Sequence, residues 1–239
     1  MTAEELLKSS FGGLGISLSA ADINNFMEYS RLLRQWNEVM NLTAITDEEG
    51  IILKHFADSV SPLSVLDIPK NASLIDVGTG AGFPGVPVKI VRSDIRLTLV
   101  DSLNKRINFL NTVCETLGLT DTECIHSRAE ELSRKADKRE SYDYCLSRAV
   151  APLNVLAEYC LPFVRIGGTF AALKGPNAFT EIEAADKAVA LMGGKIESVK
   201  DLEIPGTDLK HTLVVINKVK PTPAQYPRKG AAISKRPIV

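Results

Sequence analysis

Cysteine and histidine are scarce in this sequence, and neither is spaced as a metal site requires. The four cysteines form no CxxC pair, and the three histidines form no HxH or HExxH pair. Structural zinc sites are built from ligands paired at such spacings. No metal is therefore expected, and the thiols are expected to be reduced, as they are in cytoplasmic proteins.

Long apolar runs are also missing. No stretch approaches the roughly 18 apolar residues of a membrane span, and the N-terminus carries Glu4 and Glu5 where a secretory signal would be positively charged. We therefore expect a cytoplasmic protein that is not associated with a membrane. With 239 residues, 45% hydrophobic and 24% charged, the chain has the composition of a globular protein, and its length predicts one sizeable core with an appendage.

Net charge is nearly absent, since 28 basic and 29 acidic side chains give −1. This total gives no sign of a polyanionic partner. The distribution of charge along the chain does give such a sign. Residues 1–69 hold 4 basic and 10 acidic side chains, residues 70–208 hold 17 basic and 19 acidic ones, and residues 209–239 hold 7 basic and no acidic ones. The basic end predicts either an arm for an anionic partner or a solubilising terminus.

Hydrophobic periodicity divides the chain into three parts. Residues 1–69 predict a helical extension, because apolar residues recur at three- to four-residue spacing after the plausible N-caps Ser19 and Asp47. Residues 70–219 alternate short apolar runs with helical stretches, which predicts an α/β domain with a mostly parallel sheet. Residues 220–239 form a basic tail.

The predicted elements of the α/β part follow one another closely. Strands are predicted at Ser73–Val77, Ile95–Val100, Thr122–His126, Tyr142–Ser147, Thr169–Leu173, Ile196–Leu202 and Thr212–Asn217. Helices are predicted at about 86–92, 103–117, 129–136, 152–164 and 178–192. No helix separates the last two strands, so they are expected to pair antiparallel.

A glycine-rich loop is the strongest local signal. It follows the first predicted strand and reads Asp76-Val77-Gly78-Thr79-Gly80-Ala81-Gly82-Phe83-Pro84-Gly85. Glycine permits a tight turn and the close approach of a ligand at the carboxyl edge of the sheet. Asp101 ends the second strand, where a carboxylate can accept hydrogen bonds from ribose hydroxyls. A mononucleotide-like cofactor is expected; the alternative is that the loop is only a tight turn.

The spacing of this loop separates two cofactor classes. The dinucleotide fingerprint is G-x-G-x-x-G, whereas Phe83 occupies the sixth place here and Asp76 precedes the first glycine by two. An acid there would repel a pyrophosphate, and it would suit the ammonium and sulfonium of S-adenosylmethionine. A dinucleotide-dependent oxidoreductase is therefore disfavoured.

Several further stretches are typical of one family. They are Trp36-Asn37, Asn41-Leu42-Thr43, Lys54-His55-Phe56-Ala57-Asp58-Ser59, Asp101-Ser102, Lys105-Arg106, Arg128-Ala129-Glu130, Ser147-Arg148-Ala149, Lys174-Gly175 and Tyr226-Pro227-Arg228-Lys229. With these and the glycine loop, the sequence resembles the ribosomal RNA small-subunit methyltransferase G family, also called glucose-inhibited division protein B. The tail departs from the family at residues 230–234, which replace a more proline-containing spacer.

The resemblance implies a class I S-adenosylmethionine-dependent methyltransferase fold, Rossmann-like and seven-stranded with a terminal antiparallel hairpin. It implies a cytoplasmic enzyme that methylates N7 of a guanine in the 530 loop of 16S ribosomal RNA, as free RNA or in the 30S subunit. Nothing in the sequence demands more than a monomer. The alternative is a non-catalytic RNA-binding module that retains the fold.

Cofactor-binding residues are expected along the carboxyl edge. The positions that match family contacts are Gly78, Phe83, Ala129, Glu130 and Arg148, to which our interpretation of the loop and the second strand adds Asp76, Gly80, Gly82 and Asp101. Glu130 could also be only an exposed acid at a helix start. No catalytic residue is predicted, because guanine N7 has a lone pair and no proton.

RNA-binding residues are expected beside the cofactor and in the tail. The candidates are Lys105, Arg106, Lys174, Arg228, Lys229, Lys235 and Arg236. The alternative for such side chains is a solvated surface. His55 is expected to be structural more than catalytic, Trp36 to be core more than a stacking platform, and Cys145 to be a small core residue.

Overall fold

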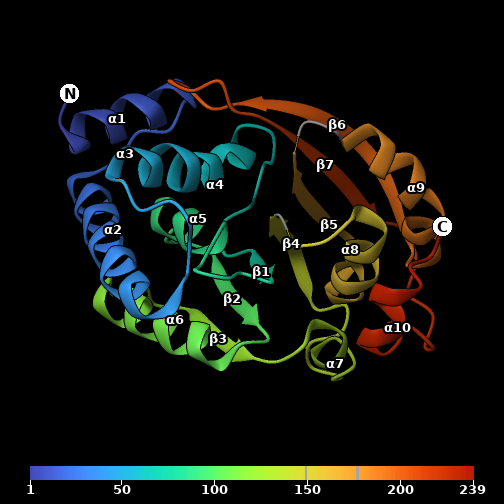
Figure 1. Cartoon of the computed structure of the whole chain (residues 1–239). Helices are drawn as coiled ribbons and strands as arrows, with labels where there is room; N and C mark the ends of the chain where they lie inside the picture. Colours follow the sequence, from blue (N-terminus) through green and yellow to red (C-terminus); the bar gives the residue numbers. More distant parts are fainter. Residues whose placement is uncertain (149, 176–177) are drawn as a thin grey trace.

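A seven-stranded sheet forms the centre of this computed structural model, which describes residues 1–148, 150–175 and 178–239 (Figure 1). Its strand order is β3-β2-β1-β4-β5-β7-β6. The strands are β1 (Ser73–Val77), β2 (Arg96–Asp101), β3 (Thr122–His126), β4 (Tyr142–Arg148), β5 (Val164–Lys174), β6 (Gly194–Glu203) and β7 (Lys210–Lys218).

Strand direction follows the connections. Strands β1 to β5 are joined through helical segments and pair parallel, whereas β7 pairs antiparallel with both β5 and β6. The predicted terminal hairpin is confirmed, because only a short turn joins β6 to β7 and it cannot cross over the sheet. Each predicted strand is present, with ends shifted by a few residues.

The helical part before the sheet consists of α1 (Ala3–Gly13), α2 (Ala20–Met40), α3 (Glu48–Gly50), the π-helix η1 (Ile51–Ala57), α4 (Asp58–Val60) and the 3-10 helix η2 (Ser61–Ser64). Both predicted N-caps are confirmed. The Ser19 hydroxyl accepts from the Asp22 amide, and an Asp47 carboxylate oxygen accepts from the Gly50 amide at 2.7 Å. These bonds satisfy amides that have no partner inside a helix.

The remaining helices cover the two faces of the sheet. They are α5 (Gly85–Val91), α6 (Asn104–Thr116), α7 (Ala129–Leu132), α8 (Leu153–Cys160), the 3-10 helix η3 (Leu161–Phe163), α9 (Ala178–Leu191) and α10 (Gly230–Lys235). Alternate strand residues enter different cores: Leu74 packs with α1, α2, η1, α5 and α6, and Ile75 packs with α8 and α9. Burial on both faces explains why these strands are continuous apolar runs.

The N-terminal helices and the sheet share one hydrophobic core. Phe26, Tyr29 and Phe56 are fully buried in the same cluster as Leu74 and Leu97. The predicted boundary at residue 69 falls in the connection between η2 and β1, and apolar packing continues across it. The N-terminal helices therefore help to place the loop that follows β1.

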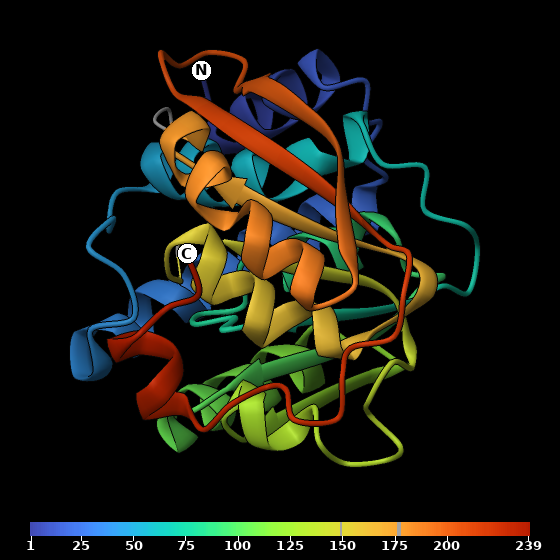
Figure 2. The ribbon, with the colours of Figure 1, turned by 90° about the vertical axis from the view of Figure 1, so that its right-hand side faces the viewer.

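The tail after β7 lies against the body of the protein (Figure 2). Arg139 donates to the carbonyls of Thr222 and Tyr226, at 2.8 and 3.0 Å. Lys218 is completely buried beside Glu140, at 3.1 Å, and burial lowers the pKa of its ammonium to about 8. The tail is therefore a packed segment and not a frayed terminus.

In the described ranges, no helix combines the length and the apolar character that crossing a bilayer requires.

Candidate functional site

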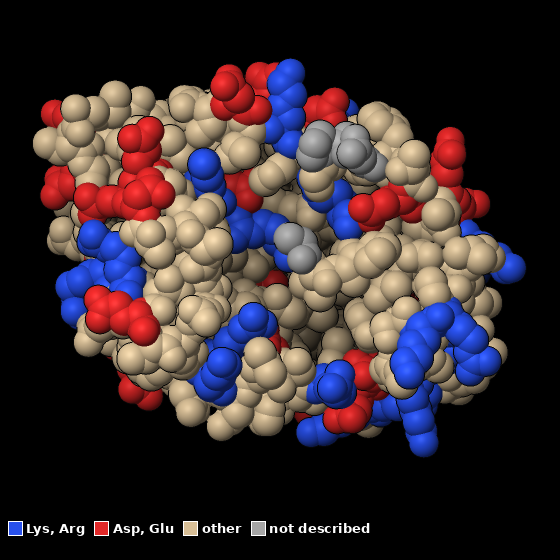
Figure 3. Space-filling view, in the orientation of Figure 1, with Lys and Arg blue, Asp and Glu red and all other residues tan. Residues whose placement is uncertain are grey.

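A cavity of about 460 Å³ opens at the carboxyl edge of the sheet, where β1, β2 and β4 end. Figure 3 shows it as a hollow in the centre of one face, with Lys and Arg side chains at points around its rim. Its walls come from the loop after β1, the ends of β2 and β4, the segment after β3, and the N-terminal helices. The lining residues include Leu42, Thr43, His55, Gly78, Gly80, Phe83, Asp101, Arg106, Arg128, Ala129, Glu130, Arg148, Val150 and Tyr159.

The glycine loop needs glycine where it turns. Gly78 has a φ of +73°, and a Cβ there would lie 2.7 Å from a methyl group of Val150. Gly82 has a φ of +100°, and a Cβ there would strike Tyr29 and Val86. Only glycine permits both the positive φ and the close approach of these neighbouring side chains. Gly78 and Gly80 line the cavity, whereas Gly82 is packed against α2 and lies behind it.

Asp76 lies beneath the loop, outside the lining of the cavity. One carboxylate oxygen accepts from the Thr79 hydroxyl at 2.7 Å and from the Gly85 amide at 2.8 Å. The other oxygen is buried and has no hydrogen-bond partner within the described ranges. Burial raises the pKa of Asp76 to about 6. Asp76 thus supports the loop through these two hydrogen bonds, and contact between its carboxylate and a ligand stays a prediction.

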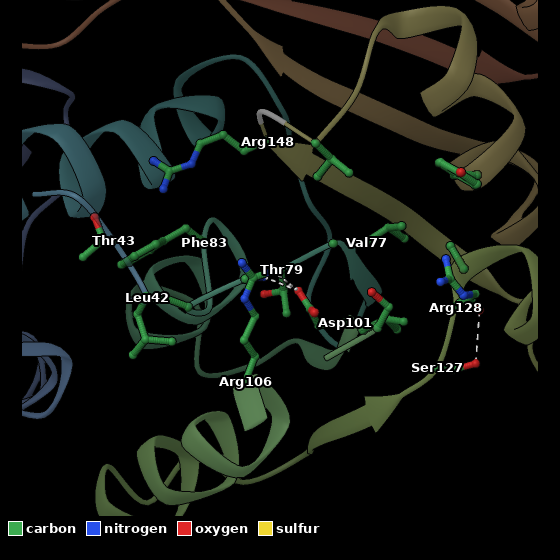
Figure 4. A pocket seen from close by; sticks show the side chains of 18 of the residues that line it. Leu42, Thr43, Val77, Thr79, Phe83, Asp101, Arg106, Ser127, Arg128 and Arg148 are labelled. Carbon is green, nitrogen blue, oxygen red and sulfur yellow. Dashed lines mark hydrogen bonds and ion pairs between the residues drawn. The ribbon is translucent and has the colours of Figure 1, made fainter. Parts of the chain in front are cut away.

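Asp101 lies in the cavity wall, as the sequence predicts. Its carboxylate accepts from the Gly80 and Leu103 amides at 3.0 and 2.9 Å, and it pairs with Arg106 at 3.1 Å. Figure 4 shows this pair at the edge of the cavity, below Thr79. Arg106 is a predicted RNA-binding residue, and here its guanidinium lies in the cavity lining beside Asp101.

Arg148 forms the opposite side of the cavity, above Phe83 (Figure 4). Its guanidinium carbon lies 5.0 Å from the centre of the Phe83 ring, and one nitrogen lies 2.6 Å from Asp58. The His55 ring stacks on Phe83 with centroids 4.5 Å apart, and its Nε2 lies 2.7 Å from the Thr43 hydroxyl. The π-helix η1 places His55 here, consistent with the frequent use of π-helical turns at functional sites, and Asp58 begins the helix α4 that follows it.

The pKa values of two histidines near Arg148 are shifted in opposite directions. Burial, and next the charge of Arg148, lower the pKa of His55 to about 4. The hydrogen bond from His211 to Asp58, at 2.5 Å, raises the pKa of His211. His55 is therefore neutral near pH 7, and the buried Asp58 carboxylate joins Arg148 to β7 through His211.

The third wall follows β3 and contains Ala129 and Glu130, as predicted. Glu130 is 6% exposed, so it is not the surface acid that the alternative interpretation allowed. Tyr159 of α8 lies nearby, and burial and then the charge of Glu130 raise its pKa. This wall is apolar on one side and acidic on the other.

The predicted RNA-binding residues fall into two groups. Lys105, Lys229, Lys235 and Arg236 are exposed. Lys174 is buried against Glu181, at 2.7 Å, and Arg228 pairs with the buried Glu158, also at 2.7 Å. Each of these pairs contains one buried charge, which is Lys174 in the first and Glu158 in the second, and a buried charge requires a partner.

Sequence reasoning missed part of the cavity. Leu42 and Thr43 line the cavity, and the sequence identified them only as part of a stretch typical of the family, which was a usable signal. Val150 and Tyr159 also line it, and no feature of the sequence indicated them. His55 lines the cavity, whereas Trp36 packs on Phe109 with centroids 5.6 Å apart, as the core interpretation predicts.

Taken together, the described residues contain no group of three His, Cys, Asp or Glu side chains placed to hold a metal ion. Charged and polar side chains instead surround a cavity with an aromatic and glycine-lined floor. Such a cavity suits a polar organic ligand with a flat ring system.

Comparison with solved structures shows the fold. TrmN from Thermus thermophilus matches with a TM-score of 0.53 and 15% identity over 70% of this chain and 53% of that chain. M. jannaschii TYW2, solved in complex with AdoMet, matches with a TM-score of 0.55 and 12% identity over 74% and 80%. The predicted class I methyltransferase fold is confirmed.

Comparison of sequences is more specific. The family model described as rRNA small subunit methyltransferase G matches residues 22–210. Curated relatives of that name from Clostridium perfringens (strain 13 / Type A) and Clostridium botulinum (strain Loch Maree / Type A3) are 47% and 49% identical, each over 98% of both chains. The chain belongs to the rRNA small subunit methyltransferase G family.

Proposed function

We propose that this protein transfers a methyl group from S-adenosylmethionine to N7 of a guanine in the 530 loop of 16S ribosomal RNA. The observation that carries the proposal is the cavity itself, in which Asp101 and the glycine loop lie together in a chain of this family. An intact cavity favours an enzyme over an RNA-binding module that has lost its cofactor.

The residues present fit this cofactor. Asp101 supplies a carboxylate for ribose hydroxyls, and Gly78 and Gly80 leave backbone exposed to a ligand. Ala129 and Glu130 form a wall of suitable size for an adenine and its amino group. The buried Asp76 makes the floor beneath the loop anionic, which favours a cationic ligand through the loop.

When bound, the cofactor supplies a methyl group on a positively charged sulfur. Guanine N7 carries a lone pair and no proton, so the chain needs no general base. The neutral His55 and the Arg148–Phe83 pair are placed to orient a base at the mouth of the cavity. Orientation alone can remove roughly 7–11 kcal/mol of barrier.

The RNA is proposed to approach from the side of the exposed cations. These are Lys105, Lys229, Lys235 and Arg236. The substrate is proposed to be 16S RNA, free or within the 30S subunit, and the protein to act as a cytoplasmic monomer. We further propose three functional parts, which are the helical extension 1–69, the methyltransferase domain 70–219 and the basic tail 220–239.

The test is methyl transfer from labelled S-adenosylmethionine to 30S subunits and to free 16S RNA, with the product mapped by nucleotide. Label on one guanine of the 530 loop is expected. No transfer to any RNA form would refute the proposal. Calorimetry with S-adenosylhomocysteine then separates the classes, since an RNA-binding module without a cofactor site gives no heat of binding.

A further inference from the structure

The tail is built into the wall of the cavity that contains Glu130. Arg228 binds both carboxylate oxygens of Glu158, at 2.7 to 3.1 Å, and Glu158 precedes the cavity residue Tyr159 in α8. Arg134, just after α7, donates to the carbonyls of Gln225 and Pro227. Figure 2 shows the tail passing α7 on its way to α10. The segment thus braces the two helices that form this wall.

Gly230 is the residue of the tail that lies against Glu130, which lines the cavity. A Cβ added to Gly230 would lie 2.9 Å from the carboxyl carbon of Glu130 and closer still to its Oε1. Gly230 opens α10 and is not among the glycines with a positive φ. Its backbone would accept alanine, so glycine is required here for space alone.

A side chain at residue 230 would displace the carboxylate and leave the tail in place. The atoms in its way are the far end of the flexible Glu130 side chain, whereas Arg228 and the contacts of Arg134 and Arg139 hold the tail backbone. The least costly response is therefore a new rotamer of Glu130. That response moves a charged group of the cavity wall.

We infer that Gly230 is a positioning residue for the cofactor: through the bare Cα of Gly230, the tail fixes the place of the Glu130 carboxylate. This inference rests on the proposed function, in which Glu130 faces the adenine end of S-adenosylmethionine. The tail then contributes to the cofactor site through Gly230, apart from any contact that its exposed cations make with RNA.

The experiment is a double-mutant cycle read by calorimetry with S-adenosylhomocysteine. We expect Gly230→Ala to weaken binding about tenfold, the cost of misplacing one charged hydrogen-bonding group. In an E130A background, where the carboxylate and the steric conflict are both gone, G230A is expected to have no further effect. G12A is the matched control, because a Cβ at Gly12 of α1 meets nothing within 4 Å.

The cycle excludes a merely structural effect. If G230A binds as tightly as the parent protein, or weakens binding equally in the E130A background, the inference is wrong. In steady state, the KM for S-adenosylmethionine should rise and the KM for RNA should stay unchanged in G230A. A parent protein that binds no S-adenosylhomocysteine would overturn the proposed function first, and the inference with it.

Discussion

Asp58 is a buried carboxylate that contacts an arginine and a histidine beside the cavity. It is 1% exposed and accepts hydrogen bonds from Arg148 of β4 and His211 of β7. Arg148 is in turn held over Phe83. A single side chain of the N-terminal helical part therefore fixes the direction of a cavity arginine that comes from the sheet.

Removing this charge should destabilise the fold. We expect Asp58→Asn to lower the free energy of unfolding by about 3 kcal/mol, because it leaves a largely buried guanidinium without its anion. Urea denaturation measures the change. The control is Glu28→Gln, which breaks an exposed pair with Arg31 and should cost less than about 1 kcal/mol. Equal costs for the two variants would contradict the structural role of Asp58.

Asp101 and Lys229 are expected to have different roles, Asp101 in binding the cofactor and Lys229 in binding RNA. Asp101→Ala should weaken S-adenosylhomocysteine binding about 10- to 100-fold, since it removes a charged acceptor from the wall. Lys229→Ala, at an exposed position of the tail, should change that affinity less than twofold. Calorimetry on both variants makes the comparison. Similar losses of S-adenosylhomocysteine affinity in the two variants would show that this division between cofactor binding and RNA binding is wrong.

The two histidines predict opposite pH dependences. The lowered pKa of His55 means that protonation opposes folding, so stability falls as the pH drops from about 6.5 to about 4. The raised pKa of His211 means that its contribution is complete below about 6.5 and is lost as the pH rises through the raised value. NMR titration of the imidazole rings, assigned with H55Q and H211Q, should show two separated midpoints; coincident midpoints would contradict this.

The sequence could locate some of these residues and not others. Asp101 was predictable, because the end of a parallel strand fixes where its side chain emerges. The direction of the Asp76 side chain was not predictable. In the sequence, Asp76 and Asp101 are equally plausible acids beside the loop, and only the hydrogen bonds from Thr79 and Gly85 show that Asp76 points inward. Lys174 and Arg228 found carboxylate partners that are close only in the folded chain.

At the scale of elements, the N-terminal helices support the glycine loop. Tyr29 of α2 donates its hydroxyl to the Ala81 carbonyl and packs against Phe83 with centroids 5.6 Å apart. Phe56 of η1 packs on Tyr29, at 5.2 Å. The loop is thus held from below by Asp76 and from the side by these aromatic rings.

Residues 70–239 alone should therefore not form the native fold. Removing 1–69 exposes the face of the sheet that Leu74 and Leu97 share with the N-terminal helices. We expect retained far-UV circular dichroism, a lost near-UV signal and binding of a hydrophobic dye. A truncated protein with dispersed NMR signals and a cooperative unfolding transition would show that the domain folds independently.

Strand and helix positions were largely predictable from the apolar runs, because central strands such as β1 and most of β2 are buried on both faces. The π-helical form of η1 was not, since its sequence has the ordinary pattern of a buried helix. The packing of the tail against the protein was also not predictable, since the sequence offered only an arm for an anionic partner or a solubilising terminus. Its basic composition conceals how Arg228 binds the buried Glu158, and no local pattern predicts such a distant pair.

At the scale of the whole molecule, the near-zero charge conceals a separation. The segment 1–69 is acidic and the segment from 209 onward is basic, and Figure 3 shows Lys and Arg side chains grouped where α10 lies in Figure 1. We therefore expect RNA to be attracted to the basic side of the protein and repelled by the acidic segment 1–69. Long-range attraction of this kind is weakened by salt.

RNA binding by the cofactor-saturated protein should accordingly depend on salt. A plot of log affinity against log salt should fall by about 0.7 for each phosphate contact. Replacing Lys229, Lys235 and Arg236 together by alanine should reduce the slope by about 2. Fluorescence anisotropy at several salt concentrations measures it. A flat plot for the parent protein would refute the electrostatic account.

The position of β7 between β5 and β6 has a consequence for how the protein is made. Synthesis is vectorial, so β6 leaves the ribosome before β7, its sheet neighbour in the described chain. Until Lys210–Lys218 has emerged, β5 keeps an open edge and β6 has no strand to join. A nascent chain paused at that stage presents an unpaired, aggregation-prone edge to its surroundings. Emergence of the last strand thus decides when a newly made chain can cover the edge of β5, a demand of biogenesis and not of chemistry.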